Sequence, residues 1–302
     1  MTFLLYNTHG PVEAIHEATA VTVGVFDGVH LGHQTLIRQL GCRKSELAPL
    51  VVTLTAHPSF VLGRHQSEYW LDDPDEHQRL LFDAGAAYIA VLPFTDEVAQ
   101  MSACRMASLM FDELNMRSLL LGYDSRFGNK EDDDFALLPQ LAEKQGFVLQ
   151  RGESCLVDGS PISSSRIRES LLAGDVGTTA TLLGRHYTVS GTVQHGRGVG
   201  HTLGFPTANI DLTDTRKMLP SEGVYAVSID GRTAVANLGT APTFGVAKPL
   251  LEVHIIDWSG DLYGRRVDVR FTHRLRDTVH FDTVDALRQQ LQHDINQARL
   301  WT

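Results

Sequence analysis

Two histidines bracket a glycine in the sequence Gly-Val-Phe-Asp-Gly-Val-His-Leu-Gly-His-Gln, which spans residues 24–34. His30 and His33 are three residues apart, a spacing that places both imidazoles on one side of a helical turn. There they can donate hydrogen bonds to phosphoryl oxygens as negative charge builds up in a transition state. The stretch therefore predicts a site for phosphate chemistry.

The elements around this stretch support the same interpretation. An apolar, β-branched run over residues 20–26 predicts a buried parallel strand, and the pattern over residues 35–40 predicts a helix that begins near Gly32. Gly28 and Gly32 permit tight backbone geometry between strand and helix. The free N–H groups and the positive dipole end of such a helix favour an anion, most simply a nucleotide phosphate.

Two alternatives for the histidines remain open. They could be surface residues beside a turn, because a short motif is weak evidence without structural context. They could also bind a metal, but no third His, Cys or carboxylate lies nearby at a ligand-like offset, and Asp27 suits the turn itself. The order of strand, Phe-Asp-Gly turn, His-Leu-Gly-His and helix instead resembles the ATP-binding signature of the nucleotidyltransferase superfamily.

A second anion-binding element is predicted in residues 162–172, which read Ile-Ser-Ser-Ser-Arg-Ile-Arg-Glu-Ser-Leu-Leu. Serines followed by arginines at the start of a helix place hydroxyl and guanidinium donors where the helix dipole favours anions. Alone, this pattern is more typical of an N-capped surface helix. Together with the histidine turn, it favours a phosphate-binding element that closes over a nucleotide.

A glycine-rich loop in the second half ends in Gly-Phe-Pro-Thr-Ala-Asn at residues 204–209. Glycines at 196, 198, 200 and 204 allow backbone N–H groups to approach phosphates, although a flexible hairpin explains the glycines alone equally well. In an extended chain, Thr207 and Asn209 point to the same side. Their hydroxyl and amide oxygens are hard neutral ligands that suit Mg²⁺ held together with ATP phosphates.

Glu252 interrupts an apolar stretch, Leu-Leu-Glu-Val-His-Ile-Ile. Alternation puts Leu251, Val253 and Ile255 on one face of a strand, and Glu252 on the other face with His254 and Ile256. A carboxylate there usually has a partner or a function, and it could take a proton from a substrate hydroxyl that attacks a γ-phosphate. A carboxylate on the outer face of a barrel is the alternative.

The first part of the chain alternates between strands and helices. Strand patterns fall at residues 50–54, 87–92, 118–122 and 147–150, and helix patterns at 73–84, 102–114 and 135–145. This alternation predicts a Rossmann-like α/β domain with a parallel sheet covered on both faces and ligands at the carboxyl ends of its strands. His57 and Asp124 follow strands, so we expect both in the same crevice as the histidine turn.

After residue 184 the pattern changes to strands, at residues 187–194, 223–229, 233–238, 250–257 and 265–272. Strands without intervening helices predict a small antiparallel β-barrel. A helix over residues 283–300, with Val284, Leu287, Leu291 and Ile295 on one face, completes this second domain. The predicted domains are therefore residues 1–183 and 184–302.

The composition of the chain limits the classes of protein to which it can belong. A chain of 302 residues with 43% hydrophobic and 21% charged residues is typical of a soluble globular protein with two domains. The net charge of −10 argues against a general nucleic-acid binder. We expect neither a signal peptide nor a membrane span, because the N-terminal apolar core is short and no run approaches about 20 apolar residues. Three widely spaced cysteines, Cys42, Cys104 and Cys155, favour reduced thiols in a cytoplasm.

Motifs along nearly the whole chain resemble the prokaryotic bifunctional riboflavin kinase/FAD synthetase family. Besides the histidine turn, they are Ala-His-Pro at 56–58, Leu-Gly-Tyr-Asp-Ser-Arg-Phe-Gly at 121–128, Ile-Ser-Ser-Ser-Arg-Ile-Arg at 162–168, Leu-Leu-Gly-Arg-His-Tyr at 182–187, Thr-Leu-Gly-Phe-Pro-Thr-Ala-Asn at 202–209, Pro-Ser-Glu-Gly-Val-Tyr-Ala at 220–226, Asn-Leu-Gly-Thr-Ala-Pro-Thr-Phe-Gly at 237–245, Glu-Val-His at 252–254 and Asp-Leu-Tyr-Gly-Arg-Arg at 261–266. So many motifs in one order make a chance similarity untenable.

The resemblance implies two ATP-dependent steps, riboflavin to FMN in the barrel and FMN to FAD in the N-terminal domain. It implies that Glu252 is the base on the ribityl hydroxyl, that His30 and His33 stabilise the α-phosphoryl transition state, and that Thr207 and Asn209 hold Mg²⁺. Further nucleotide-binding residues would be Gly24, Phe26, Asp27, Gly32, Ser164, Ser165, Arg168, Gly196, Gly198 and His201, and flavin-binding residues His57, Asp124 and Phe127. The implied partners are the small-molecule substrates riboflavin, FMN and ATP, with no nucleic acid or membrane, and with a homo-oligomer left open.

The sequence departs from the family pattern at a few positions. Val25 stands where Asn is frequent, Ser125 where Phe is frequent, Ser165 where Thr is frequent and Ala241 where Arg is frequent, and His201 replaces a common Lys or Arg. Ser165 keeps a hydroxyl, whereas His201 makes one phosphate contact dependent on pH. None of these departures removes a group that is assigned to chemistry. Two alternatives to the bifunctional enzyme stay open: an adenylyltransferase whose barrel only binds flavin, and a flavin carrier without turnover.

Overall fold

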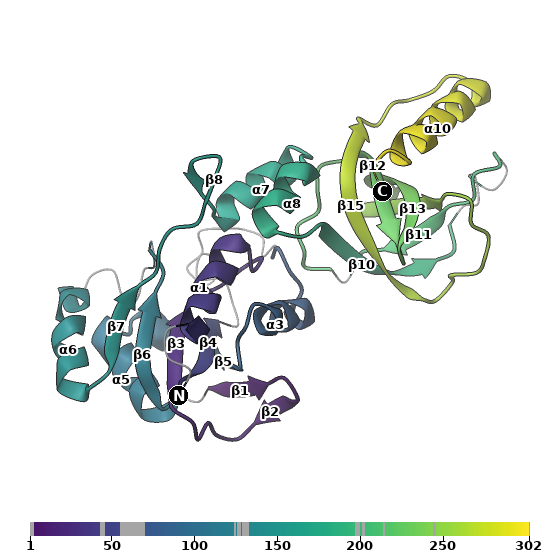
Figure 1. Cartoon of the computed structure of the whole chain (residues 1–302). Coiled ribbons are helices and arrows are strands. Elements are labelled where there is room, and N and C mark those ends of the chain that lie inside the picture. The colour runs from purple at the N-terminus through teal and green to yellow at the C-terminus, as the bar shows by residue number, and fades with distance from the viewer. Residues whose placement is uncertain are drawn as a thin grey trace. The chain divides into compact units, whose positions relative to one another are not determined.

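The computed structural model describes residues 3–42, 46–54, 70–123, 125, 128, 133–196, 200, 203–213, 215–243 and 246–301. Contacts divide the chain into two compact units, Met1–Ser163 and Ser164–Thr302 (Figure 1).

The described part of the first unit contains a seven-stranded sheet with the order β2-β1-β5-β4-β3-β6-β7. Strands β3 to β7 pair in parallel, and β1 and β2 add an antiparallel edge. The strands are β1 (Leu4–Asn7), β2 (Gly10–Val12), β3 (Thr19–Val23), β4 (Ala48–Leu54), β5 (Tyr88–Leu92), β6 (Met116–Leu121) and β7 (Val148–Arg151), and a separate hairpin joins β8 (Leu156–Val157) to β9 (Ser160–Pro161). The predicted parallel sheet is confirmed.

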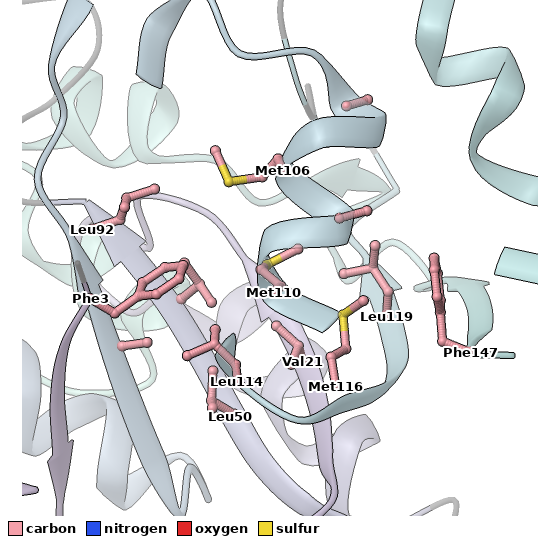
Figure 2. Packing of buried hydrophobic residues seen from close by; sticks show 14 of the residues in the cluster. Phe3, Val21, Leu50, Leu92, Met106, Met110, Leu114, Met116, Leu119 and Phe147 are labelled. Atoms are coloured by element: carbon pink, nitrogen blue, oxygen red, sulfur yellow. The ribbon is translucent and has the colours of Figure 1, made fainter. Parts of the chain in front are cut away.

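Helices cover both faces of this sheet. They are α1 (Leu31–Cys42), α3 (Pro74–Asp83), α4 (Asp96–Ala99), α5 (Ala103–Glu113), the 3-10 helix η1 (Asp133–Leu137) and α6 (Leu138–Gln145). Successive residues of β4 show the two faces: Leu50 and Val52 belong to the apolar cluster that includes Met110 of α5, whereas Val51 belongs to the cluster that includes Ile37 of α1. Figure 2 shows the first of these clusters. Apolar residues on consecutive positions of a strand are what a sheet buried on both faces requires.

In the first unit the structure adds a hairpin that was not predicted and shortens one predicted strand. The β1–β2 hairpin was not predicted, because its strands are short, partly exposed and contain Pro11. The strand predicted over residues 20–26 ends at Val23, since the chain turns sharply from Gly24 onward.

The second unit contains a closed six-stranded barrel with the order β10-β11-β14-β13-β12-β15 in its described residues. The strands are β10 (Tyr187–Gln194), β11 (Ala208–Asp211), β12 (Gly223–Ile229), β13 (Arg232–Thr243), β14 (Val246–Ile255) and β15 (Arg266–Arg276), all paired antiparallel. The predicted barrel is confirmed, and only the short β11 lacked a strand prediction.

The helices in the described part of the second unit are α7 (Ser164–Leu172), α8 (Val176–Leu183) and α10 (Val284–Ala298). Ile295 and Ala298 of α10 pack with Val224 and Val235 on the outside of the barrel. The predicted apolar face of this helix is correct except at Val284, which is 56% exposed. Among the described residues, no helix combines the length and apolarity needed to cross a membrane.

Candidate active sites

The turn between β3 and α1 has an unusual backbone. Phe26 and Val29 have positive φ values of 53° and 34°, and Gly28 has a φ of 81°. Positive φ is unfavourable for Phe and Val, and such strain is kept mainly at functional sites. The Phe26 ring lies 3.2 Å from the point where a side chain on Gly24 would begin, and its centroid is 5.1 Å from that of His33. A side chain on Gly24 would therefore crowd the Phe26 ring.

His30 caps helix α1. Its Nδ1 accepts a hydrogen bond from the backbone N–H of His33 at 3.3 Å, and its carbonyl accepts one from Gln34 at 2.9 Å. Because Nδ1 accepts, the proton of a neutral His30 imidazole is on Nε2. A side chain on Gly32 would begin 3.1 Å from the His30 ring, so this glycine makes room for the imidazole.

His33 stacks on His30, with ring centroids 3.5 Å apart and an interplanar angle of 20°. Burial lowers the pKa of His33 well below its usual value of 6.5, and the nearby His30 and His77 lower the pKa further, against a hydrogen bond with the Phe26 backbone that raises it. The imidazole is thus neutral near pH 7. Its buried Nδ1 has no hydrogen-bond partner among the described residues.

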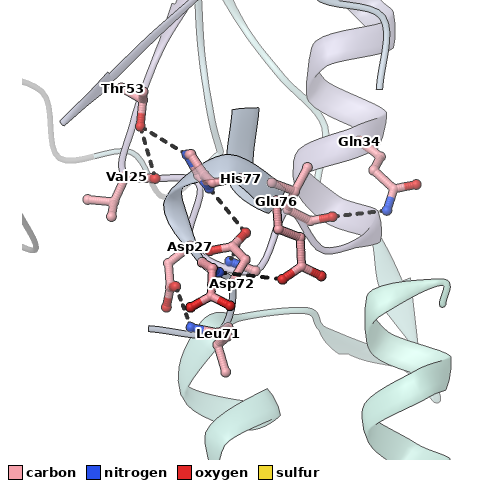
Figure 3. Close-up of polar contacts among 11 residues, drawn as sticks. Val25, Asp27, Gln34, Thr53, Leu71, Asp72, Glu76 and His77 are labelled. Carbon is pink, nitrogen blue, oxygen red and sulfur yellow. Dashed lines mark hydrogen bonds and ion pairs between the residues drawn. The ribbon is translucent and has the colours of Figure 1, made fainter. Parts of the chain in front are cut away.

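A network of buried polar side chains holds the turn in place (Figure 3). Asp72 Oδ2 accepts a hydrogen bond from the N–H of Gly28 at 3.2 Å and lies 3.1 Å from His77 Nδ1. His77 Nε2 lies 3.3 Å from the hydroxyl of Thr53, which donates to the carbonyl of Val25 at 3.2 Å. The network links the ends of two neighbouring strands to α3, and it fixes the backbone on both sides of Phe26.

Asp27 also belongs to this bracing. It is 1% exposed, and its Oδ1 accepts a hydrogen bond from the N–H of Leu71 at 2.8 Å. The side chain therefore points into the protein, in keeping with the expectation that Asp27 serves the turn. Its contact with a nucleotide stays a prediction.

Ser164, Ser165 and Arg168 lie in the first two turns of α7, as predicted. The same helix is anchored by Ile167 and Leu171, which are fully buried. By its contacts α7 belongs to the second unit, so the convergence of these donors with His30 and His33 stays a prediction.

The second unit has a cavity of about 230 Å³ between the barrel wall and α10. Its wall is mostly apolar, with polar groups concentrated on the barrel side. It is lined by Gly200, Phe205, Thr207, Val224, Val235, Asn237, Glu252, His254, Arg276, Thr278, Val279, Phe281, Leu287, Leu291, Asp294 and Ile295. A pocket of this kind suits a small molecule with an apolar body and a polar end.

Glu252 faces this cavity. The predicted alternation is confirmed, because Leu251 and Val253 are fully buried in the barrel whereas Glu252 and His254 line the cavity. The carboxylate thus lies on the outer face of the barrel, and α10 turns that face into a pocket. His254 is held by a 2.8 Å contact between its Nδ1 and the carbonyl of Pro206.

Thr207 lines the same cavity, and Asn209 pairs directly with Glu252 across β11 and β14. Two glycines of the glycine-rich loop lie against these side chains, Gly196 against Asn209 and Gly200 against Thr207. A Cβ on Gly196 would overlap the Asn209 amide, and a Cβ on Gly200 would overlap the Phe205 carbonyl and lie 3.2 Å from the Thr207 hydroxyl. In this structure Gly196 therefore gives space to Asn209, and its predicted contact with a nucleotide is not tested.

A buried ion pair closes the cavity at the α10 end. Arg276 donates from Nε and Nη2 to the Asp294 carboxylate at 2.7 to 3.1 Å, and Gln290 adds a 2.8 Å bond to Asp294 Oδ1. Asp294 is 1% exposed. The pair fastens the helix to the last strand of the barrel.

Five residues of these sites were not predicted from the sequence: Asp72, His77, Asn237, Arg276 and Asp294. Asn237 and Asp294 carried a usable signal, because each is a polar residue within an apolar strand or helix face, as Glu252 is. Asp72 and His77 carried none, since their role depends on the folded turn.

Several predicted residues fall outside the described part of the chain. They are His57, Asp124, Phe127, Gly198 and His201. Among the described residues no group of three His, Cys, Asp or Glu side chains could hold a metal ion, so the histidine turn has no third ligand of these types there.

Comparisons with known proteins agree on both halves. A family model for FAD synthetase matches residues 12–166, and one for riboflavin kinase matches residues 183–302. A protein from Haemophilus influenzae named bifunctional riboflavin kinase/FMN adenylyltransferase is 35% identical over 292 residues, or 94% of each chain. The protein of the same name from Escherichia coli K12 is 33% identical over 304 residues, which cover 98% of this chain and 96% of the relative.

A solved structure from Streptococcus pneumoniae, described as a macrolide-efflux protein, is also similar. It has a TM-score of 0.88 and 31% sequence identity, covering 96% of this chain and 97% of that one. Its description concerns the S. pneumoniae protein alone.

Proposed function

The chain belongs to the bifunctional riboflavin kinase/FMN adenylyltransferase family, and on that premise we propose where and how its two reactions take place. Riboflavin is phosphorylated by ATP to FMN, and FMN is adenylylated by a second ATP to FAD with release of pyrophosphate. We assign the first reaction to residues 184–302 and the second to residues 1–183.

The kinase reaction is assigned to the cavity beside α10. The observation that supports it is that Glu252 and Thr207 face one cavity whose remaining wall is largely apolar. Glu252 takes the proton from the terminal ribityl hydroxyl of riboflavin, the hydroxyl oxygen attacks the γ-phosphorus of ATP, and ADP leaves. The apolar wall receives the flavin ring and keeps water away from the phosphoryl group.

A magnesium ion fits the donors at one end of this cavity. The Thr207 hydroxyl and the Asn209 amide oxygen are hard oxygen ligands, and Gly196 leaves the space that the Asn209 side chain fills. Bound together with ATP, the ion would neutralise charge on the phosphates. The protein's own part is to hold these two oxygens beside Glu252.

The adenylyltransferase reaction is assigned to the turn between β3 and α1. The FMN phosphate attacks the α-phosphorus of ATP, so no covalent intermediate with the protein is required. His30 and His33, stacked on each other at the start of α1, are assigned to the stabilisation of the phosphoryl oxygens in the transition state. Ser164, Ser165 and Arg168 would hold the remaining phosphates. The strained, braced turn supports this assignment because it positions donors before the substrate arrives.

The remaining assignments are broader. The substrates are small molecules, and we place the protein in the cytoplasm because its cysteines are odd in number and widely spaced.

A time course with riboflavin, ATP and Mg²⁺ tests the assignment of two working sites. We expect FMN to appear first and FAD to follow, with ADP tracking the first step and pyrophosphate the second. Accumulation of FMN without FAD would locate a defect in the first unit and direct attention to Val25 and Ser125. Formation of neither product would favour a flavin carrier.

A further inference from the structure

One row of side chains crosses the barrel wall of the cavity. In register, Asn209 on β11 pairs with Glu252 on β14, Glu252 pairs with Asn237 on β13, and Asn237 pairs with Val224 on β12. Paired residues of neighbouring strands point to the same face of a sheet, so these four side chains share the face that α10 covers. The row changes from polar at Asn209 to apolar at Val224.

Asn237 has a buried polar atom without a partner. It lines the cavity beside Glu252, yet its Oδ1 has no hydrogen-bond donor among the described residues. A buried acceptor without a donor is costly, and native proteins retain such groups mainly where a ligand or water satisfies them. The oxygen therefore points to a donor that the substrate brings.

The neighbours of Asn237 limit what that donor can be. Val224, Val235, Leu291 and Ile295 form the apolar side of the cavity, which suits an aromatic ring system and offers it no hydrogen bonds. Glu252 lies on the other side of Asn237, where the reacting hydroxyl must be. In a substrate that spans these two ends, a hydroxylated chain connects the ring to the reacting oxygen. This chain then lies over Asn237.

We propose that Asn237 is a substrate-binding residue of the kinase site, and that its Oδ1 accepts a hydrogen bond from a hydroxyl of the ribityl chain between the flavin ring and the phosphorylated end. This inference rests on the proposed function of the cavity. Asn237 makes the site select for a polyol chain, because a flavin without hydroxyls leaves the buried oxygen unsatisfied.

The test uses the full-length protein and the kinase reaction. It compares the KM for riboflavin with the inhibition constant of lumiflavin, a flavin that carries a methyl group in place of the ribityl chain. The Asn237→Leu variant is expected to raise the KM for riboflavin about tenfold, as the loss of one hydrogen bond in a buried site predicts. The inhibition constant of lumiflavin should stay within about twofold of the wild-type value.

Two controls separate binding from damage to the fold. Asn296→Leu replaces an exposed asparagine on α10 and should change neither constant. Conversion of supplied FMN to FAD by Asn237→Leu should proceed at the wild-type rate. Asn237→Ser shortens the side chain without adding apolar bulk and replaces the leucine variant if that variant folds poorly. It should likewise raise the KM for riboflavin and leave the inhibition constant of lumiflavin unchanged.

Two results would overturn the inference: unchanged KM for riboflavin in both variants, or an equal rise in both constants, which would mean that Asn237 only shapes the cavity. If the wild-type protein phosphorylates riboflavin, such a result leaves the proposed function intact. A wild-type protein that cannot phosphorylate riboflavin would overturn both.

Discussion

Asp27 and Asp72 each accept a hydrogen bond from the backbone N–H of a residue that adjoins the other aspartate. Asp27 Oδ1 accepts the N–H of Leu71 at 2.8 Å, and Asp72 Oδ2 accepts the N–H of Gly28 at 3.2 Å. Both carboxylates are almost fully buried. This reciprocal pair of bonds keeps the turn after β3 in its strained conformation, because neither segment can move without breaking a hydrogen bond to a buried carboxyl group.

Replacement of Asp72 should therefore impair one reaction only. In Asp72→Ala, Gly28 and His77 both lose their acceptor, so we expect the rate of FAD formation from FMN to fall at least tenfold. Riboflavin phosphorylation should be unchanged. The matched control is Asp75→Ala, an exposed carboxylate three residues on. Equal rates of FAD formation in Asp72→Ala and wild type would show that the turn needs no bracing.

The lowered pKa of His33 predicts a pH-dependent stability. The unfolded chain binds a proton near pH 6.5, whereas folded His33 binds it only at lower pH. Below pH 6.5 the unfolded state therefore holds more protons, and the free energy of unfolding decreases as the pH falls. His33→Gln removes this contribution.

Urea unfolding of the first unit at pH 7.5 and pH 5.5 measures the effect. The loss of stability on acidification should be smaller in His33→Gln than in the wild type. His16→Gln, at an exposed histidine of the same unit, should behave like the wild type. The same loss in His33→Gln and in wild type would contradict the assigned shift.

Gly196 is expected to be sensitive to the smallest possible side chain. A Cβ there would overlap the Asn209 amide, whereas a Cβ on Gly239, a strand glycine of the same barrel, meets nothing within 4 Å. Gly196→Ala should thus displace Asn209 and lower the kinase rate at least tenfold, and Gly239→Ala should not. Similar kinase rates in the two variants would show that the position of Asn209 does not affect catalysis.

The Arg276–Asp294 pair should stabilise the wall of the kinase cavity. Asp294→Ala leaves the partly buried guanidinium of Arg276 without its carboxylate, at a cost of about 3 kcal/mol in the free energy of unfolding of the second unit. Riboflavin should also bind more weakly, since α10 is no longer fastened to β15. Arg299 and Asp257 form an exposed pair on the same unit, so Asp257→Asn provides a control that should leave unfolding unchanged. Equal stability in the two variants would exclude a structural role for the pair.

Much of the fold was predictable because each half has a consistent local pattern. Largely apolar runs such as residues 50–54 indicated the parallel sheet, and the strand predicted over residues 187–194 has the bounds of β10. Strand β11 was not predicted because it is only four residues long and two of those are polar, so its pairing depends on β10 and β14.

The sites were predictable only in part, for a physical reason. Residues within one motif, such as His30 and His33, keep their spacing in the fold and could be assigned together. Residues that meet through tertiary contacts, such as Asp72 with Gly28 or Arg276 with Asp294, have no fixed spacing in the sequence. The outer face of a barrel strand could not be recognised as a binding surface until α10 was seen to cover Glu252.

The assignment of two reactions to two independent sites is tested by one comparison. Wild-type protein and Glu252→Gln are each supplied with ATP and Mg²⁺ and either riboflavin or FMN, and the initial rates of FMN and FAD formation are measured by chromatography. Glutamine keeps the shape of the side chain but cannot act as a base, so FMN formation from riboflavin should fall at least about a hundredfold. FAD formation from supplied FMN should match the wild type. Riboflavin phosphorylation at the wild-type rate, or an equal loss of both reactions, would contradict the account.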